Sequence, residues 1–151
     1  MAESVVYASL FAGVLAQLPT LRTRFAAFDT SLTDLTPFLH DPVEILFGVQ
    51  LGGGTDIAAA LAWCRTQIDR PRRSVLVLIS DLFEGGDGET MRRRVAEMVA
   101  SGVTVIVLLA LADDGAPAHD HDHAAALAAV GARVLAATPD EFPDLLADAL
   151  A

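Results

Sequence analysis

The sequence contains no lysine, because all ten of its basic residues are arginines. This absence excludes a Walker-A phosphate-binding lysine, a Schiff-base lysine and the lysine of receiver-type or haloacid-dehalogenase-type sites. Basic residues are also outnumbered by twenty acidic ones, so the formal net charge is −10. A chain this acidic repels a phosphate backbone and an anionic lipid surface. We therefore expect neither nucleic acid nor a membrane as a partner.

Cysteine and long hydrophobic runs are scarce as well. The single cysteine, Cys64, excludes an intrachain disulfide and any multi-cysteine zinc site, and it is typical of a reduced, cytoplasmic protein. The longest apolar stretches, Val5–Ala16 and Val103–Ala112, are shorter than the roughly 20 residues that a spanning helix needs. Glu3 stands before the first stretch, where a secretory signal carries basic residues. Both stretches are expected to be core elements of a cytoplasmic protein.

The pattern of apolar segments predicts one domain over residues 1–151. With 53% hydrophobic residues, a chain of this length encloses a real core. Two uninterrupted apolar runs, Ser74–Ser80 and Val103–Leu111, are typical of parallel strands covered on both faces, and we expect them to be neighbours. The other expected elements are helices over Val5–Leu18, Val43–Phe47, Asp56–Ile68, Glu89–Ala100, Ala124–Val130 and Pro139–Leu150, a hairpin of Leu21–Phe28 and Leu32–Leu35, and an edge strand over Arg133–Ala137.

This alternation predicts an α/β fold, a doubly wound and mostly parallel open sheet with one antiparallel hairpin at its edge. Folds of this class normally open with a strand, because the first helix packs back on the strand that precedes it. This chain instead opens with a helix. We therefore expect its first central strand to be missing.

Two motifs are expected at the carboxyl ends of strands, where open α/β sheets form their sites. One is Gly52-Gly53-Gly54-Thr55-Asp56, and the other is Ile79-Ser80-Asp81. Both also suit the N-cap of a following helix. The glycine loop has neither the length and lysine of a P-loop nor the GxGxxG dinucleotide pattern, and the sequence contains no GxSxG nucleophile motif. Hydroxyl and carboxylate oxygens at Thr55 and Asp81 instead suit Mg²⁺.

With these residues, GGGTDIAAAL followed by LVLISDLFEGG, the sequence resembles the von Willebrand factor type A (VWA) domain. The resemblance covers the whole chain and is strongest to the bacterial, intracellular CoxE-like form associated with MoxR-type AAA+ ATPases. It implies a metal-ion-dependent adhesion site, in which Mg²⁺ is held by an Asp-x-Ser-x-Ser motif, a threonine and an aspartate. Thr55 and Asp81 match the last two ligands and are expected to lie close together at one end of the sheet. The Asp-x-Ser-x-Ser motif is absent, and Ser4 does not replace it.

The resemblance implies a cytoplasmic protein-interaction module and not an enzyme. In the intact form Mg²⁺ would keep one position open for an Asp or Glu of a protein partner, an AAA+ ATPase or its substrate complex. The chain looks truncated before its first strand, so we expect weak or absent Mg²⁺ binding. We also expect the isolated chain either to be unstable or aggregation-prone or to borrow a strand from elsewhere. Two alternatives stay open: a Mg²⁺-dependent phosphoryl-transfer or hydrolase domain of similar topology, and a non-functional fragment.

Three other clusters have simpler interpretations. The run His119-Asp120-His121-Asp122-His123 contains only possible metal ligands, but we expect a solvated loop that leads into the helix at Ala124. Asp113 and Asp114 follow the strand Val103–Leu111 and are interpreted as turn residues, with added negative potential near Asp81 as the alternative. The arginines at 92, 93 and 94 are expected to form a solvated helix face.

Overall fold

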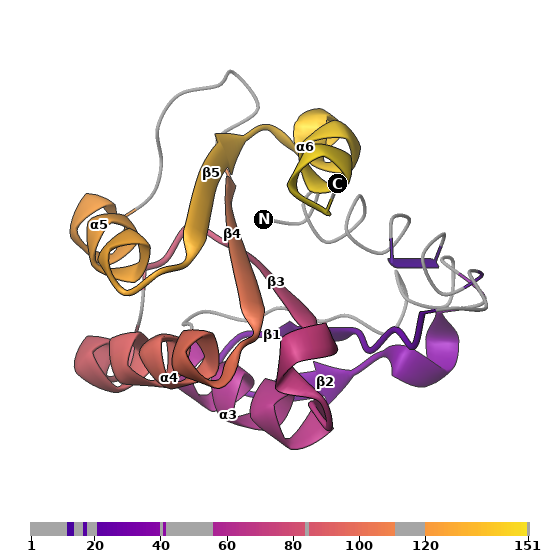
Figure 1. Ribbon diagram of the computed structural model, residues 1–151, viewed down its shortest axis with the longest axis horizontal. Helices are drawn as coiled ribbons and strands as arrows, with labels where there is room; N and C mark the ends of the chain where they lie inside the picture. Colours follow the sequence, from indigo (N-terminus) through magenta and orange to yellow (C-terminus); the bar gives the residue numbers. More distant parts are fainter. Residues whose placement is uncertain are drawn as a thin grey trace.

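The structure is a computed structural model, and it describes residues 12–13, 17, 21–39, 41, 56–83, 85–110 and 120–150. Two of the expected elements, the helices Val5–Leu18 and Val43–Phe47, lie outside these residues, except that Ala12 and Gly13 are helical. The described helices and strands form the layered arrangement of Figure 1. None of these helices is both long and apolar enough to cross a membrane.

A parallel sheet of three strands forms the centre of the fold. The strands are β3 (Val75–Ser80), β4 (Thr104–Ala110) and β5 (Arg133–Ala137), in the order β3-β4-β5. Val75 is opposite Thr104 in the first pair, and Ile106 is opposite Arg133 in the second. The predicted parallel pairing of the two apolar runs is therefore confirmed. Parallel strands linked through helices also confirm the predicted fold class.

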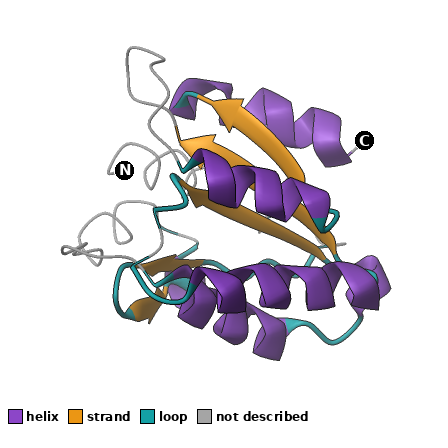
Figure 2. Ribbon diagram, turned by 90° about the vertical axis from the view of Figure 1, so that its left-hand side faces the viewer, coloured by secondary structure: helices purple, strands orange, loops and turns teal. Residues whose placement is uncertain are grey.

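The two faces of this sheet are covered by different helices (Figures 1 and 2). On one face, Leu76 and Leu78 of β3 and alternate residues of β4 pack with the helices α3 (Ile57–Gln67), α4 (Gly88–Ser101) and α5 (His121–Ala129). On the other face, Ile106 and Leu108 pack against Phe142 of α6 (Phe142–Leu150). Helices on both faces make the sheet doubly wound.

One face of β3 departs from the prediction. Ser74–Ser80 was expected to be covered on both faces, yet Val75 is 47% exposed and Val77 is 37% exposed. In the part of the chain that the structure describes, α6 packs near β4, β5 and Ile79 of β3, and these two valines belong to neither core cluster of the sheet. The outer edge of β3 also has no paired strand among the described residues. The expectation of a missing first strand stays a prediction.

The predicted hairpin is confirmed, but its first strand is shorter than expected. β1 (Ala26–Phe28) pairs antiparallel with β2 (Leu32–Asp34), and together they form a sheet of their own. The prediction that the strand begins at Leu21 is wrong. Pairing stops at Phe25, whose N–H donates to the Thr36 hydroxyl (3.0 Å) while its carbonyl accepts from the N–H of Leu35 (2.8 Å). Thr36 belongs to a short 3-10 helix, Thr36–Phe38, so the ladder cannot continue there.

The remaining helix bounds follow from caps. Asp56 is the N-cap of α3, and its carboxylate accepts from the N–H of Ala59 (2.9 Å). Gly102 ends α4 with φ +108, in the left-handed region that glycine adopts without strain. The helix predicted over Ala124–Val130 begins three residues earlier, at His121, because Asp120 serves as its N-cap. A 3-10 turn, Pro139–Glu141, forms the first part of the predicted closing helix.

Candidate functional site at the carboxyl edge of the sheet

Asp81 follows the last residue of β3 and lies half-buried at the carboxyl edge of the parallel sheet. The next residue, Leu82, is fully buried and has a φ of +63, which is unusual for a residue with a side chain. Phe83 then turns outward and is 53% exposed. The chain therefore buries Leu82 while it presents Asp81 and Phe83 at the edge.

The backbone at Leu82 is strained and is held from both sides. A non-glycine residue in the left-handed region costs about 1 kcal/mol or more, and such strain persists only where the surroundings enforce it. Here the buried hydroxyl of Ser80 accepts from the N–H of Leu82 (3.0 Å), and the Leu82 side chain belongs to the main core. Strained residues of this kind concentrate at functional sites. The surrounding structure therefore enforces the conformation of the loop after β3.

In the described part of the chain, only one oxygen of the Asp81 carboxylate accepts a hydrogen bond. Its Oδ1 accepts from the N–H of Phe83 (3.2 Å), and its main-chain carbonyl accepts from the N–H of Asp120 (2.9 Å). Within the described part of the chain, no group bonds to Oδ2. One carboxylate oxygen at the carboxyl edge is thus available to a hard cation or to a hydrogen-bond donor.

Helix α3 brings the second motif toward the same edge. Arg94 of α4 donates to the main-chain oxygen of Ala58, and Arg65 pairs with Glu97 (2.8 Å), so the two helices run in the same direction. Since α4 begins after the carboxyl end of β3, α3 also begins on that side. Its N-cap, Asp56, is tied by its N–H to the carbonyl of Asp29 in the hairpin turn (2.8 Å). Arg94 is therefore a tie between helices, and the expectation of a solvated face is wrong for it.

Several predicted site residues lie outside the described residues: Gly52, Gly53, Gly54, Thr55, Asp113, Asp114 and Ser4. The predicted proximity of Thr55 and Asp81 therefore stays a prediction. Among the residues that the structure does describe, no three His, Cys, Asp or Glu side chains form a group able to hold a metal. Hard oxygen donors at Asp81 and Thr55 fit Mg²⁺ in kind, since Mg²⁺ is commonly held by one or two carboxylates and keeps several waters.

The histidine-rich run differs from its prediction. Its last three residues, His121, Asp122 and His123, form the first turn of α5 and are not a loop. His123 is only partly exposed, and its Nδ1 lies 2.9 Å from the carbonyl oxygen of Leu82. Sequence reasoning missed this contact. The signal available was Asp120 as an N-cap three residues before His123, whose N–H donates to the Asp120 carboxylate (3.0 Å).

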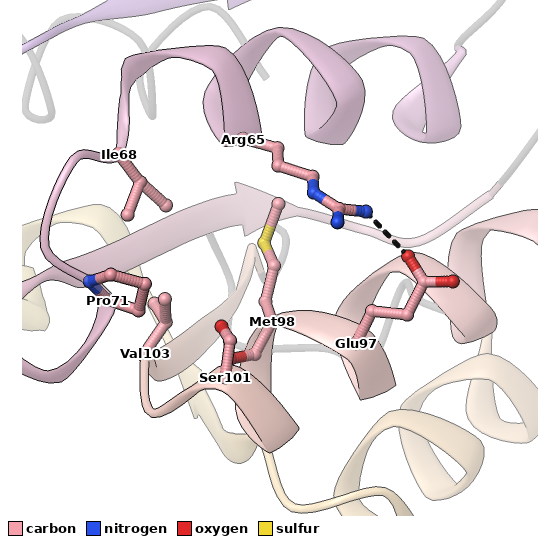
Figure 3. A pocket seen from close by; sticks show the side chains of 7 residues that line it. All are labelled: Arg65, Ile68, Pro71, Glu97, Met98, Ser101 and Val103. Atoms are coloured by element: carbon pink, nitrogen blue, oxygen red, sulfur yellow. Dashed lines mark hydrogen bonds and ion pairs between the residues drawn. The ribbon is translucent and has the colours of Figure 1, made fainter.

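A pocket of about 180 Å³ lies elsewhere, between the C-terminal ends of α3 and α4 (Figure 3). Pro71 and Val103 precede β3 and β4 in the chain, so this pocket is at the amino edge of the sheet, opposite Asp81. Its floor is apolar, and the exposed pair Arg65 and Glu97 closes one side. The pocket and the candidate site are therefore separate features. The residues that line it are Arg65, Ile68, Pro71, Glu97, Met98, Ser101 and Val103.

Comparison with known sequences identifies relatives along the whole chain. The family model described as "VWA domain containing CoxE-like protein" matches residues 1–146. The Escherichia coli (strain K12) protein named "Uncharacterized protein YehP" is 45% identical over 150 residues. The match covers 99% of this chain, and the chain spans about 40% of the length of that relative.

Two solved structures share the fold. An aerotolerance-related membrane protein from Bacteroides fragilis NCTC 9343 superposes with a TM-score of 0.68 at 16% identity, over 97% of this chain and 87% of that one. The conserved hypothetical protein BatB from Bacteroides thetaiotaomicron superposes with a TM-score of 0.63 at 12% identity, over 95% and 86% of the two chains. At these identities the likeness shows the fold alone.

Proposed function

The chain belongs to the family of CoxE-like proteins that contain a VWA domain, and from this membership we propose that it is a protein-interaction module whose contact site is the carboxyl edge of the parallel sheet. The observation that carries the proposal is the Asp81 carboxylate. It stands at that edge on a strained and anchored loop, with Oδ2 free of any described protein group. A module whose partner binds there needs a ligand group of this kind.

We assign Thr55 and Asp81 as ligands of a Mg²⁺ ion at this edge. The ion would supply the positive charge that lets an acidic chain accept a carboxylate from its partner. Without an ion between them, the Asp81 carboxylate and a carboxylate of the partner would repel each other, and the formal charge of −10 would add to that repulsion. With two protein ligands and no Asp-x-Ser-x-Ser motif, affinity for Mg²⁺ is weak in this chain.

The partner in this proposal is a protein that offers an Asp or Glu side chain, of which a MoxR-type AAA+ ATPase is the specific candidate. Phe83, 53% exposed beside Asp81, would add an apolar contact next to the ionic one. Aromatic groups of this kind often contribute much of the energy of an interface. In this proposal the module works in the cytoplasm and has no catalytic activity.

Titration calorimetry with Mg²⁺ and Mn²⁺ tests the metal site. We expect Asp81→Ala to reduce the affinity of the protein for Mn²⁺ at least tenfold, and Thr55→Ala to reduce it less, because a hydroxyl carries no charge. Asp69→Ala is the matched control, since that exposed carboxylate pairs with Arg22 (2.8 Å) and precedes β3 at the opposite edge. Equal losses from Asp69→Ala and Asp81→Ala would show that the ion binds by general charge.

Binding to a purified MoxR-type ATPase tests the interaction. We expect complex formation in Mg²⁺, loss of the complex in EDTA and loss with Asp81→Ala. A complex that survives both treatments would contradict a metal-bridged contact. Absence of a complex together with absence of Asp81-dependent metal binding would favour the alternative of a non-functional fragment.

A further inference from the structure

Helix α5 is attached to the loop that presents Asp81 by two hydrogen bonds to consecutive carbonyls. The N–H of Asp120 donates to the carbonyl of Asp81 (2.9 Å), and Nδ1 of His123 lies 2.9 Å from the carbonyl of Leu82. His123 and Leu82 are 41 positions apart in the chain. The start of α5 therefore fixes the backbone on both sides of the strained residue.

The imidazole of His123 is itself held in place. On one side, the Asp120 carboxylate lies 3.4 Å from Nδ1. On the other side, the ring packs against Gly88, the first residue of α4: a Cβ at that position would lie only 2.6 Å from Nε2. The ring thus fills a space that any side chain at position 88 would occupy. Its orientation toward Leu82 is set by two neighbouring helices.

The chemistry of the contact assigns a tautomer. The Leu82 carbonyl only accepts, so Nδ1 of His123 must carry the proton and donate. A neutral imidazole protonated on Nδ1 is sufficient for this bond. The bond restrains a residue with φ +63, whose relaxation would rotate the peptide planes on both of its sides. The carboxylate of Asp81 would then point in a different direction.

We propose that His123 is a positioning residue: its Nδ1–H bond to the Leu82 carbonyl holds Asp81 in the orientation that the candidate metal site needs. The metal part of this inference rests on the proposed function, whereas the restraint on the loop does not. It makes the position of α5 a determinant of the site, so a movement of α5 changes how Asp81 is presented.

Two variants separate the hydrogen bond from the bulk of the ring. His123→Leu replaces the imidazole by an apolar side chain of similar reach and so removes the donor. His123→Asn places an amide N–H near the position of Nδ1 and restores it. Asp122→Leu is the control, because it introduces the same leucine at the preceding, exposed position of α5. All three variants are compared with the unchanged protein for thermal stability.

Hydrogen exchange in the absence of metal is the first measurement. The amides of Leu82 and Phe83 are both bonded, to the Ser80 hydroxyl and the Asp81 carboxylate. We expect His123→Leu to speed their exchange about tenfold or more, whereas the amides of β4 stay as slow as before. His123→Asn should restore most of the protection. Unchanged exchange in His123→Leu, or no rescue by His123→Asn, would overturn the proposal.

Affinity for Mn²⁺ is the second measurement. We expect at least a fivefold loss with His123→Leu, recovery with His123→Asn and no change with Asp122→Leu. Asp81-dependent binding that is unaffected by His123→Leu overturns the positioning role and leaves the proposed function intact. No Asp81-dependent binding in any variant overturns the proposed function, and the exchange measurement then decides alone whether His123 restrains the loop.

Discussion

The guanidinium of Arg94 donates to the main-chain oxygen of Ala58 and so ties the middle of α4 to the first turn of α3. Because a charged donor meets a partly buried acceptor, the bond is stronger than an exposed ion pair. Together with the Arg65–Glu97 pair, this bond shows that the two helices run in the same direction, so the start of α3 lies on the side of the sheet where Asp81 lies. Arg94 thereby connects the helix that follows the glycine motif with the helix that follows Asp81.

Removal of this tie should destabilise the protein. We expect Arg94→Ala to lower the free energy of unfolding by about 1 kcal/mol or more, since a charged hydrogen bond is lost. Arg93→Ala, which removes an exposed neighbour, should change it by less than about 0.5 kcal/mol. Urea unfolding followed by circular dichroism measures both. Similar small losses in the two variants would contradict the role of Arg94.

The exposed face of β3 should govern self-association. Val75 and Val77 present apolar surface beside an edge without a described partner strand. We expect the 151-residue chain to associate at micromolar concentrations, and Val77→Lys to shift it toward the monomer without lowering its melting temperature. Light scattering after size exclusion measures the mass. Leu76→Lys, on the buried face, should instead unfold the chain. Unfolding by both variants would mean that Val77 is covered in solution.

Gly88→Ala should have opposite effects on the stability of the protein in the presence and in the absence of the His123 ring. Alanine favours a helix over glycine by up to about 1 kcal/mol, but its Cβ would lie 2.6 Å from Nε2 of His123. We expect Gly88→Ala to destabilise the unchanged protein and to stabilise His123→Ala. A double-mutant cycle from thermal unfolding measures the coupling. The same change in both backgrounds would show that the ring does not pack against Gly88.

The thiol of Cys64 should react slowly in the folded protein. Burial against the main core raises its pKa to about 11. Since the thiolate is the reactive form, little of it is present at pH 8. We expect reaction with a disulfide reagent to be at least about a hundredfold slower than in denaturant, where the pKa returns to about 8.5. Absorbance at the wavelength of the released thiol follows the rate. Comparable rates would show that Cys64 is accessible.

Two helix caps should make the protein sensitive to acid. The N–H of His123 holds the pKa of Asp120 below its usual range, and the Thr90 hydroxyl, followed by the N–H of Glu89, does the same to the pKa of Asp87. A lowered pKa in the folded state gives stability that is complete above the ordinary value of 3.8 and is lost as the pH falls through the folded value.

The combined variant Asp87→Asn/Asp120→Asn should therefore lose less stability between pH 5 and pH 3 than the unchanged protein, because asparagine caps a helix without titrating. Urea unfolding at each pH gives the two curves. Asp69→Asn, which removes a carboxylate that caps no helix, serves as the control. A parallel fall of all three curves would show that the caps do not cause the acid sensitivity.

Local patterns of residues predict the class of fold and the position of Asp81. Uninterrupted apolar runs identify β3 and β4 as strands of a parallel sheet, although only β4 is buried on both faces. Caps such as Asp56 and the glycine at 102 act within one turn of a helix, so the helix bounds were predictable to within a few residues. Asp81 follows from the end of a buried strand.

How these elements meet depends on contacts between residues that are far apart in the chain. The contact of His123 with Leu82 spans 41 residues, and no local pattern encodes it. The left-handed backbone of Leu82 arises because its side chain is drawn into a core that distant helices complete. The exposure of Val77, likewise, depends on which elements reach that face of the sheet. The periodicity of the sequence shows which side of a helix or strand is apolar. Packing between segments far apart in the chain determines which partner covers that side.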